Sequence, residues 1–129
     1  MPLVRIDVVE GRAPAELRRL ADVVQEVLEE VFAAPPRDRY QVVSEHPSSH
    51  LILQDTGLGF DRTEDRILVQ VFQQGRSEDQ KKALYARLAE RLQADCGIAP
   101  TDLMVSIAAN AREDWSFGFG RAQFLEGDL

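Results

Sequence analysis

The second half of this chain repeats the first half at a fixed offset of 64 positions. At that offset six landmark residues meet the same residue type without a gap: Gly11 and Gly75, Arg12 and Arg76, Leu20 and Leu84, Leu28 and Leu92, Pro36 and Pro100, and Asp38 and Asp102. Such self-similarity indicates that one supersecondary unit occurs twice in the chain. The fold must therefore accommodate two similar halves.

Each half has the pattern of a strand, a helix and a second strand. Apolar runs at 3–9 and 67–72 predict the first strands, and runs at 40–44 and 103–108 predict the second ones. Between them, apolar residues recur at three- and four-residue steps, as on one face of an amphipathic helix. These residues are Leu17, Leu20, Val24, Leu28 and Val31 in the first half and Leu84, Leu88 and Leu92 in the second.

The ends of both helices are marked in the sequence. Ser77 is placed to cap the second helix, and Glu78 and Asp79 suit the positive end of that helix. Both helices are predicted to stop at segments rich in Gly or Pro, 33–36 and 96–100. A helix of about five turns therefore fits into each half.

This order of elements predicts an α/β (α+β) fold built from duplicated β-α-β units. We expect a four-stranded sheet with two helices on one face, and a right-handed crossover wherever two strands are parallel. The chain 1–129 is predicted to be a single domain with halves at about 2–46 and 66–109 and a C-terminal tail at 110–129. In the linker between the halves, the apolar run 51–53 predicts a short extra strand or an apolar contact.

The face of the sheet away from the helices has no cover within one chain. The first strand carries Val4, Ile6 and Val8 on one side, but Leu3 and Val9 on the other side are also apolar. Closed homo-oligomers are the common way to cover such a face and to protect sheet edges. The pattern therefore predicts self-association.

Charge and apolar content exclude several classes of function. The formal net charge of −7 repels phosphate backbones and disfavours binding of nucleic acid. The longest apolar stretches fall far below the roughly 20 residues that cross a bilayer. The sequence shows no secretory leader pattern, and the single cysteine, Cys96, has no partner for an intrachain disulfide. We therefore expect a cytoplasmic protein without membrane or nucleic-acid partners.

Pro2 is the first candidate for chemistry. Aminopeptidases remove an initiator Met when a small residue follows, so we expect the mature chain to begin at Pro2 with a secondary amine. Neighbouring charges and burial can tune the proton affinity of such an amine. Pro is also a common second residue without any function, so the position alone decides nothing.

Five blocks of residues together resemble the malonate semialdehyde decarboxylase branch of the tautomerase superfamily. They are Pro2-Leu3, 10–12, 37–46, 55–59, and the closing 114–118 with 120–122. The resemblance spans nearly the whole chain, and the subunits of this family are two joined β-α-β units that assemble as trimers. It therefore implies a homotrimer here and a site that acts on a small carboxylic acid without a cofactor.

The resemblance also implies roles for individual residues. Pro2 matches the catalytic proline, whose cationic form polarises the aldehyde oxygen of the substrate, and Asp38 matches the acidic residue that assists it. Arg76 matches one of two arginines that hold the substrate carboxylate. An apolar wall beside the site is matched by Trp115, Phe117, Phe124 and Leu129. A cation near the carbonyl would stabilise the enolate that forms as carbon dioxide leaves.

One position departs from the family pattern. The second arginine of the carboxylate clamp falls on Gln74, which can donate only a neutral hydrogen bond. The departure predicts weaker binding of the acid or a different substrate. The remaining arginines that could substitute are Arg37, Arg39, Arg62 and Arg66. Arg12, the duplicate of Arg76, is expected to be structural or to lie at a subunit interface.

Three functions remain open from the sequence. The first is decarboxylation of malonate semialdehyde or a similar 3-oxo acid, and the second is keto-enol tautomerisation (phenylpyruvate-type) or hydration of unsaturated acids. The third is a trimeric binding module without activity, which only Gln74 favours. We predict no metal site, because Pro47 separates His46 and His50 and disfavours the helix that their spacing requires. Cys96 has no neighbouring His to make it a nucleophile.

Overall fold

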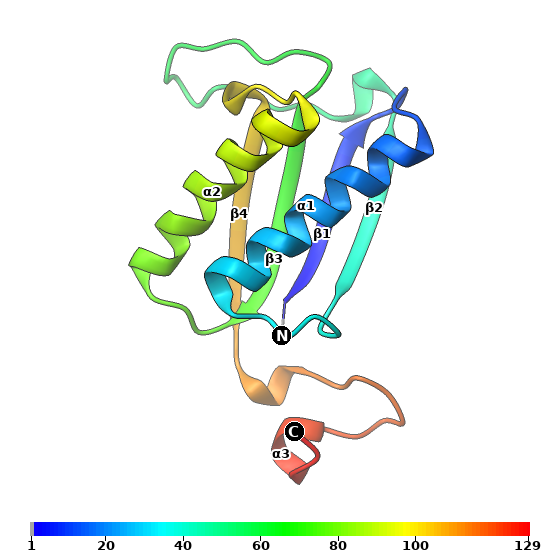
Figure 1. The fold of residues 1–129 in the computed structure, drawn as a ribbon, viewed down its shortest axis with the longest axis vertical. Coiled ribbons are helices and arrows are strands. Elements are labelled where there is room, and N and C mark those ends of the chain that lie inside the picture. Colours follow the sequence, from blue (N-terminus) through cyan, green and yellow to red (C-terminus); the bar gives the residue numbers. More distant parts are fainter. Residues whose placement is uncertain (1) are drawn as a thin grey trace.

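The computed structural model describes residues 2–129 (Figure 1). The first half contains strand β1 (Leu3–Val9), helix α1 (Pro14–Phe32) and strand β2 (Tyr40–His46), and the second contains β3 (Ile67–Gln74), α2 (Glu78–Cys96) and β4 (Leu103–Asn110). Short helices follow β2, α2 and β4 and close the chain: η1 (Ser48–His50), η2 (Pro100–Asp102), η3 (Arg112–Asp114) and α3 (Gln123–Glu126). The expected order of elements is confirmed.

The four strands form one mixed sheet in the order β2-β1-β3-β4. Within each half the two strands are parallel, and the halves meet at the centre through the antiparallel pair β1 and β3. Both long helices cover the same face of the sheet (Figure 1). This confirms the duplicated β-α-β fold and places the beginnings of β1 and β2 beside the end of β3.

The core lies between the sheet and the two helices. The alternating residues of β1 and β3 that face the helices are buried, as are Leu84, Leu88 and Leu92 on the apolar stripe of α2. In α1 the apolar stripe contributes Leu20, Val24 and Leu28 to the same cluster. Burial of a large aliphatic side chain stabilises a fold by about 1.5–3 kcal/mol, so this single layer supplies most of the drive for folding.

Three strands run about two residues beyond the apolar runs of the sequence, to His46, Gln74 and Asn110. The hydrogen-bond ladder continues through polar residues there, because Gln73 pairs with Ala109 and Gln74 pairs with Asn110. Pairing depends on the backbone, so the strand ends where its neighbour ends and not where its side chains become polar.

The helix ends follow the expected chemistry. The Ser77 hydroxyl accepts a hydrogen bond of 3.1 Å from the amide of Gln80 and caps α2. Both helices end in the left-handed conformation, at Gly97 in α2 and at Ala33 in α1. The amide of Ala34 then bonds to the carbonyl of Leu28, which turns the chain back toward the sheet.

The linker between the halves contains η1 but, among the described residues, no strand at 51–53. Leu51 is buried whereas Ile52 is exposed, so the apolar contact occurs and the extra strand does not. After β4, the tail from η3 to α3 extends past the end of the sheet at which the amino terminus lies (Figure 1). Within residues 2–129 no helix is long and apolar enough to span a membrane.

Candidate active site

The candidate site lies at the end of the sheet where β1 and β2 begin and β3 ends (Figure 1). Pro2 is buried and directly precedes β1. Leu3 pairs with Tyr40 of β2 on one side and with Phe72 of β3 on the other. The residue that the sequence singles out as the amine is therefore enclosed between two strands, while Met1 and its removal lie outside the described residues.

Asp38 lies in the turn between α1 and β2, close to this end of the sheet. Its amide donates a hydrogen bond of 2.9 Å to the Pro35 carbonyl, and its side chain is only 6% exposed. Burial raises the pKa of the Asp38 carboxyl, and the positive charge of the amino terminus lowers it in part. A carboxyl of this kind is suited to hold or transfer a proton.

A cavity of about 370 Å³ joins Asp38 to the C-terminal tail. Its walls are formed by Pro35, Arg37, Asp38, Tyr40, Phe117 and Leu129. The structure thus brings together three of the predicted site residues, Asp38, Phe117 and Leu129. Tyr40 belongs to the same wall, although the sequence indicated it only as part of a motif.

The predicted apolar wall is a stack of aromatic rings centred on Phe117. Its ring lies 5.5 Å from that of Trp115 and 5.5 Å from that of Phe124, and it also stacks on Tyr40 at 5.7 Å. The indole of Trp115 donates a hydrogen bond of 3.0 Å to Asn110 at the end of β4, which fixes the wall to the sheet. Trp115 and Phe117 also line a neighbouring cavity of about 420 Å³ with Leu3 and Phe72.

The remaining two predicted residues, Gln74 and Arg76, line neither cavity. The Arg76 guanidinium donates hydrogen bonds to the carbonyls of Gln74, Gly75 and Phe32 at 2.8–3.2 Å, and it lies over the Phe32 ring. These bonds use three of the five N–H donors of a guanidinium. They tie the end of β3 to the end of α1.

Of the four arginines that could replace the missing cation, Arg37 lies nearest to the chemistry, because it lines the cavity with Asp38. Arg39 pairs with Asp22 on α1 at 2.7 Å. Arg62 and Arg66 bind carbonyls of the linker and of the segment before β4. The structure therefore brings only Arg37 of this group to the site.

In the second half, the residues equivalent to Asp38 and Arg76 bond to the linker. Asp102, the counterpart of Asp38, accepts bonds of 2.6 Å from both the amide and the hydroxyl of Thr63. Arg12, the counterpart of Arg76, donates to the carbonyl of Asp65. Linker residues thus bind both second-half counterparts, and Arg12 connects the start of α1 to the linker.

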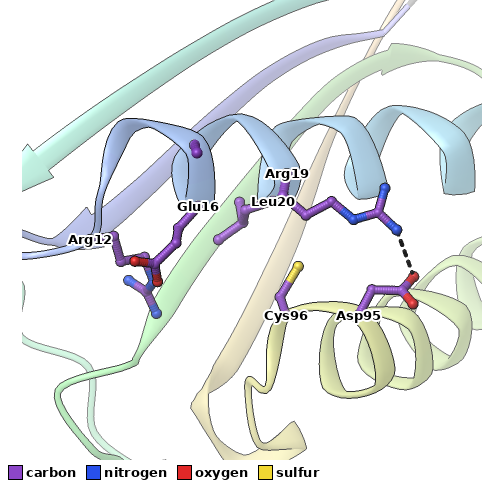
Figure 2. Close-up of a pocket in the computed structure, with 7 residues that line it drawn as sticks. Arg12, Glu16, Arg19, Leu20, Asp95 and Cys96 are labelled. Carbon is purple, nitrogen blue, oxygen red and sulfur yellow. Dashed lines mark ion pairs between the residues drawn. The ribbon is translucent and has the colours of Figure 1, made fainter.

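A different cavity, of about 300 Å³, lies between α1 and α2 at the opposite end of the molecule. Figure 2 shows Arg19 of α1 and Asp95 of α2 pointing toward one another there, with an ion pair of 3.6 Å. Cys96 also lines this cavity, and burial raises the pKa of its thiol. A protonated thiol is a poor nucleophile, so this cavity offers less chemistry than the site near Pro2.

His46, one of the two histidines considered as metal ligands in the sequence, bonds to a carboxylate on β1. Its Nε2 lies 2.6 Å from the carboxylate of Asp7 across the face of the sheet that the helices leave open. Within residues 2–129 no group of three or more His, Cys, Asp or Glu side chains is placed to hold a metal ion.

Comparison with known proteins defines the class. A family model described as a tautomerase enzyme matches residues 38–118, and a second model with the same description matches residues 2–61. The chain belongs to the tautomerase family of enzymes, and its duplicated fold is the tautomerase fold.

Individual relatives show which members of the family this chain is similar to. The probable tautomerase YrdN of Bacillus subtilis (strain 168) is 52% identical, with 100% of each chain covered. A malonate semialdehyde decarboxylase, whose structures address decarboxylase and hydratase activities, is 42% identical with a TM-score of 0.95, covering 98% of each chain. A fused 4-OT that forms a symmetric trimer shares the fold at a TM-score of 0.79 and 20% identity, covering 97% of this chain and 98% of that one.

Proposed function

We propose that this enzyme decarboxylates malonate semialdehyde or a similar 3-oxo acid, with the Pro2 amine as its catalytic group and no cofactor. The observation that carries the proposal is that Pro2 is buried at the end of the sheet where Asp38 and Phe117 line one cavity. The resemblance to a malonate semialdehyde decarboxylase over 98% of the chain supports this substrate class.

The chemistry needs a cation at the carbonyl end of the substrate. As the bond between the carboxylate carbon and the methylene carbon breaks, its electron pair passes into an enolate, and carbon dioxide leaves. A protonated Pro2 donates a hydrogen bond to the enolate oxygen and so stabilises the charge that develops in the transition state. A proton then adds to the methylene carbon and gives the aldehyde.

The surroundings of Pro2 suit these requirements. The buried Asp38 carboxyl can orient the substrate or a water molecule beside the amine. The rings of Trp115, Phe117 and Phe124 offer a dry surface that favours loss of the carboxylate charge as carbon dioxide. Arg37, Gln74 and Arg76 are the groups that we assign to the substrate carboxylate, although Gln74 and Arg76 lie outside the two cavities.

The test is a comparison of wild type with Pro2→Ala on malonate semialdehyde. Intact mass must first show that Met1 is absent, because Met1 would turn the amine into an amide. We expect Pro2→Ala to lower kcat by about 10²–10⁴-fold, the usual contribution of one proton-donating group. Full activity on chains that all retain Met1 would exclude the proline mechanism.

Keto-enol tautomerisation or hydration of unsaturated acids is the second candidate. It is favoured by the relative that is 52% identical and carries the name probable tautomerase. A neutral Pro2 would serve these reactions as the base, whereas decarboxylation requires the cation. Activity on phenylpyruvate or 2-oxo-3-pentynoate that exceeds activity on malonate semialdehyde would favour this candidate.

We also propose that the enzyme is a homotrimer. The open face of the sheet carries exposed apolar side chains, among them Tyr40, Val42 and Met104. Packing of three such faces around a common axis would cover them. The trimer formed by a fused 4-OT of the same fold supports this symmetry.

A further inference from the structure

Gln73, next to the end of β3, has a buried hydrogen-bond acceptor without a donor. Its side chain is 1% exposed, and no donor within residues 2–129 reaches its Oε1 atom. A buried polar atom left unpaired costs about 1–3 kcal/mol, so such an atom calls for a physical explanation. The sequence analysis did not single out Gln73, because glutamine at a strand end is ordinary.

The orientation of the Gln73 amide is determined by its neighbour. Its Nε2 donates a hydrogen bond of 3.1 Å to the carbonyl of Gln74, which Arg76 also binds. A carbonyl can only accept, so the NH₂ group must face it and the Oε1 atom must face away. The acceptor is therefore held in one direction and is not free to find another donor by rotating.

The register of the sheet places Gln73 opposite Pro2. In the antiparallel pair of β1 and β3, Val4 lies opposite Val71 and Leu3 opposite Phe72, so the next position joins Pro2 to Gln73. Alternation along the strands puts both side chains on the helix side of the sheet, where both are buried. Directly opposed residues have Cβ atoms about 4.5–5.5 Å apart, which is within reach of a glutamine side chain.

We infer that Oε1 of Gln73 accepts a hydrogen bond from the Pro2 ammonium of the mature chain. While Met1 is attached, the Pro2 nitrogen is an amide without a hydrogen to donate. Removal of Met1 gives a secondary amine, whose protonated form has two N–H donors beside the unpaired acceptor. Gln73 is then a positioning residue that orients the amine and favours its cationic form. This inference rests on the proposed role of Pro2 and adds the group that holds it.

Other charges also act on the amine. Asp38 lies in the turn before β2 and favours the cation, whereas Arg37 on the same turn and Arg76 after β3 oppose it. Arg39 is neutralised in part by its ion pair with Asp22 on α1. Because these charges remain in place when Gln73 is replaced, a change in the proton affinity of Pro2 reports on Gln73 itself.

The test is an NMR titration of Pro2 in protein labelled with ¹⁵N-proline, after intact mass has shown that the chain begins at Pro2. Gln73→Met keeps the length of the side chain but removes the acceptor. We expect it to lower the pKa of Pro2 by about one unit, a tenfold loss of proton affinity. The matched control is Gln25→Met, because Gln25 on α1 is also buried with an unpaired Oε1 but lies away from Pro2. It should leave the pKa of Pro2 unchanged.

An unchanged pKa of Pro2 in folded Gln73→Met would overturn the inference. Should Gln73→Met fail to fold, Gln73→Asn draws the oxygen back by one methylene and must also lower the pKa. The titration uses no substrate, so it stands apart from the test of decarboxylation. If the enzyme has no decarboxylase activity, Gln73→Met can still lower the pKa of Pro2. If the enzyme is an active decarboxylase but Gln73→Met leaves that pKa unchanged, only the role of Gln73 is rejected.

Discussion

At the scale of single residues, Gln74 and Arg76 set the charge that is offered to the carboxylate of the proposed substrate. Arg76 donates to three backbone carbonyls, which leaves less of its guanidinium for a ligand. Gln74 has an Oε1 atom that is buried and, among the described residues, without a donor. The clamp expected from the family is therefore reduced at both of its positions.

Gln74→Arg tests whether this position binds the acid. A charge-assisted hydrogen bond contributes roughly 1.5–3 kcal/mol against about 1 for a neutral one, so we expect about a tenfold higher kcat/KM for malonate semialdehyde. The change should appear mainly in KM, measured by steady-state kinetics. Gln74→Glu is the charge-reversed control and should raise KM. Should Gln74→Arg leave decarboxylation unchanged and abolish a stronger activity, the tautomerase or hydratase function would be favoured.

At the scale of elements, the two halves use the same residue type in different ways. Asp38 and Asp102 occupy equivalent turns after α1 and α2. Both carboxylate oxygens of Asp102 accept hydrogen bonds from Thr63, and they so hold the linker against the second half. Asp38 lines a cavity, and burial raises its pKa. The duplication thus yields one aspartate that holds the linker and one that lines a cavity.

The pair Asp38→Asn and Asp102→Asn separates these roles. Because the folded protein raises the pKa of Asp38 above 3.8, its ionised form is penalised, and the penalty is complete above the folded pKa. Asp38→Asn should therefore raise Tm at neutral pH, with the gain vanishing as the pH falls below 3.8, and should lower kcat by about 10²–10⁴-fold.

Asp102→Asn should lower stability and leave catalysis unaffected. Loss of a charge-assisted bond to Thr63 should lower the free energy of unfolding by about 1–3 kcal/mol, with kcat unchanged. Thermal denaturation at several pH values and kinetics on the same samples provide both readouts. Equal loss of activity in the two variants would contradict the assignment.

At the scale of the whole molecule, the open face of the sheet decides how chains assemble. Val42 points to this face and is 44% exposed, while Val43 points to the helix side of the same edge strand and is 37% exposed. The two side chains are similarly exposed, but they lie on opposite faces of the sheet. They therefore form a matched pair for testing the assembly.

Val42→Lys should dissociate the trimer, because each subunit would bury an unpaired ammonium group at an apolar contact between faces. Val43→Lys should leave it intact, because its side chain lies away from that face. Light scattering at micromolar concentration gives the mass of each species. A monomeric wild type, or a Val42→Lys protein that stays trimeric, would contradict the proposed assembly.

The sequence alone determined the duplicated fold, because a repeat and two hydrophobic periods leave few arrangements of strands and helices. It also indicated Pro2, Asp38 and the aromatic wall, since the motifs that contain them resemble one family. Only the tertiary structure decided how equivalent residues differ, because the partners of Asp102 and Arg12, and the Phe32 carbonyl bound by Arg76, lie in segments distant in the chain. The place of Gln73 opposite Pro2 likewise depends on the register of two strands more than 60 positions apart, which no local pattern specifies.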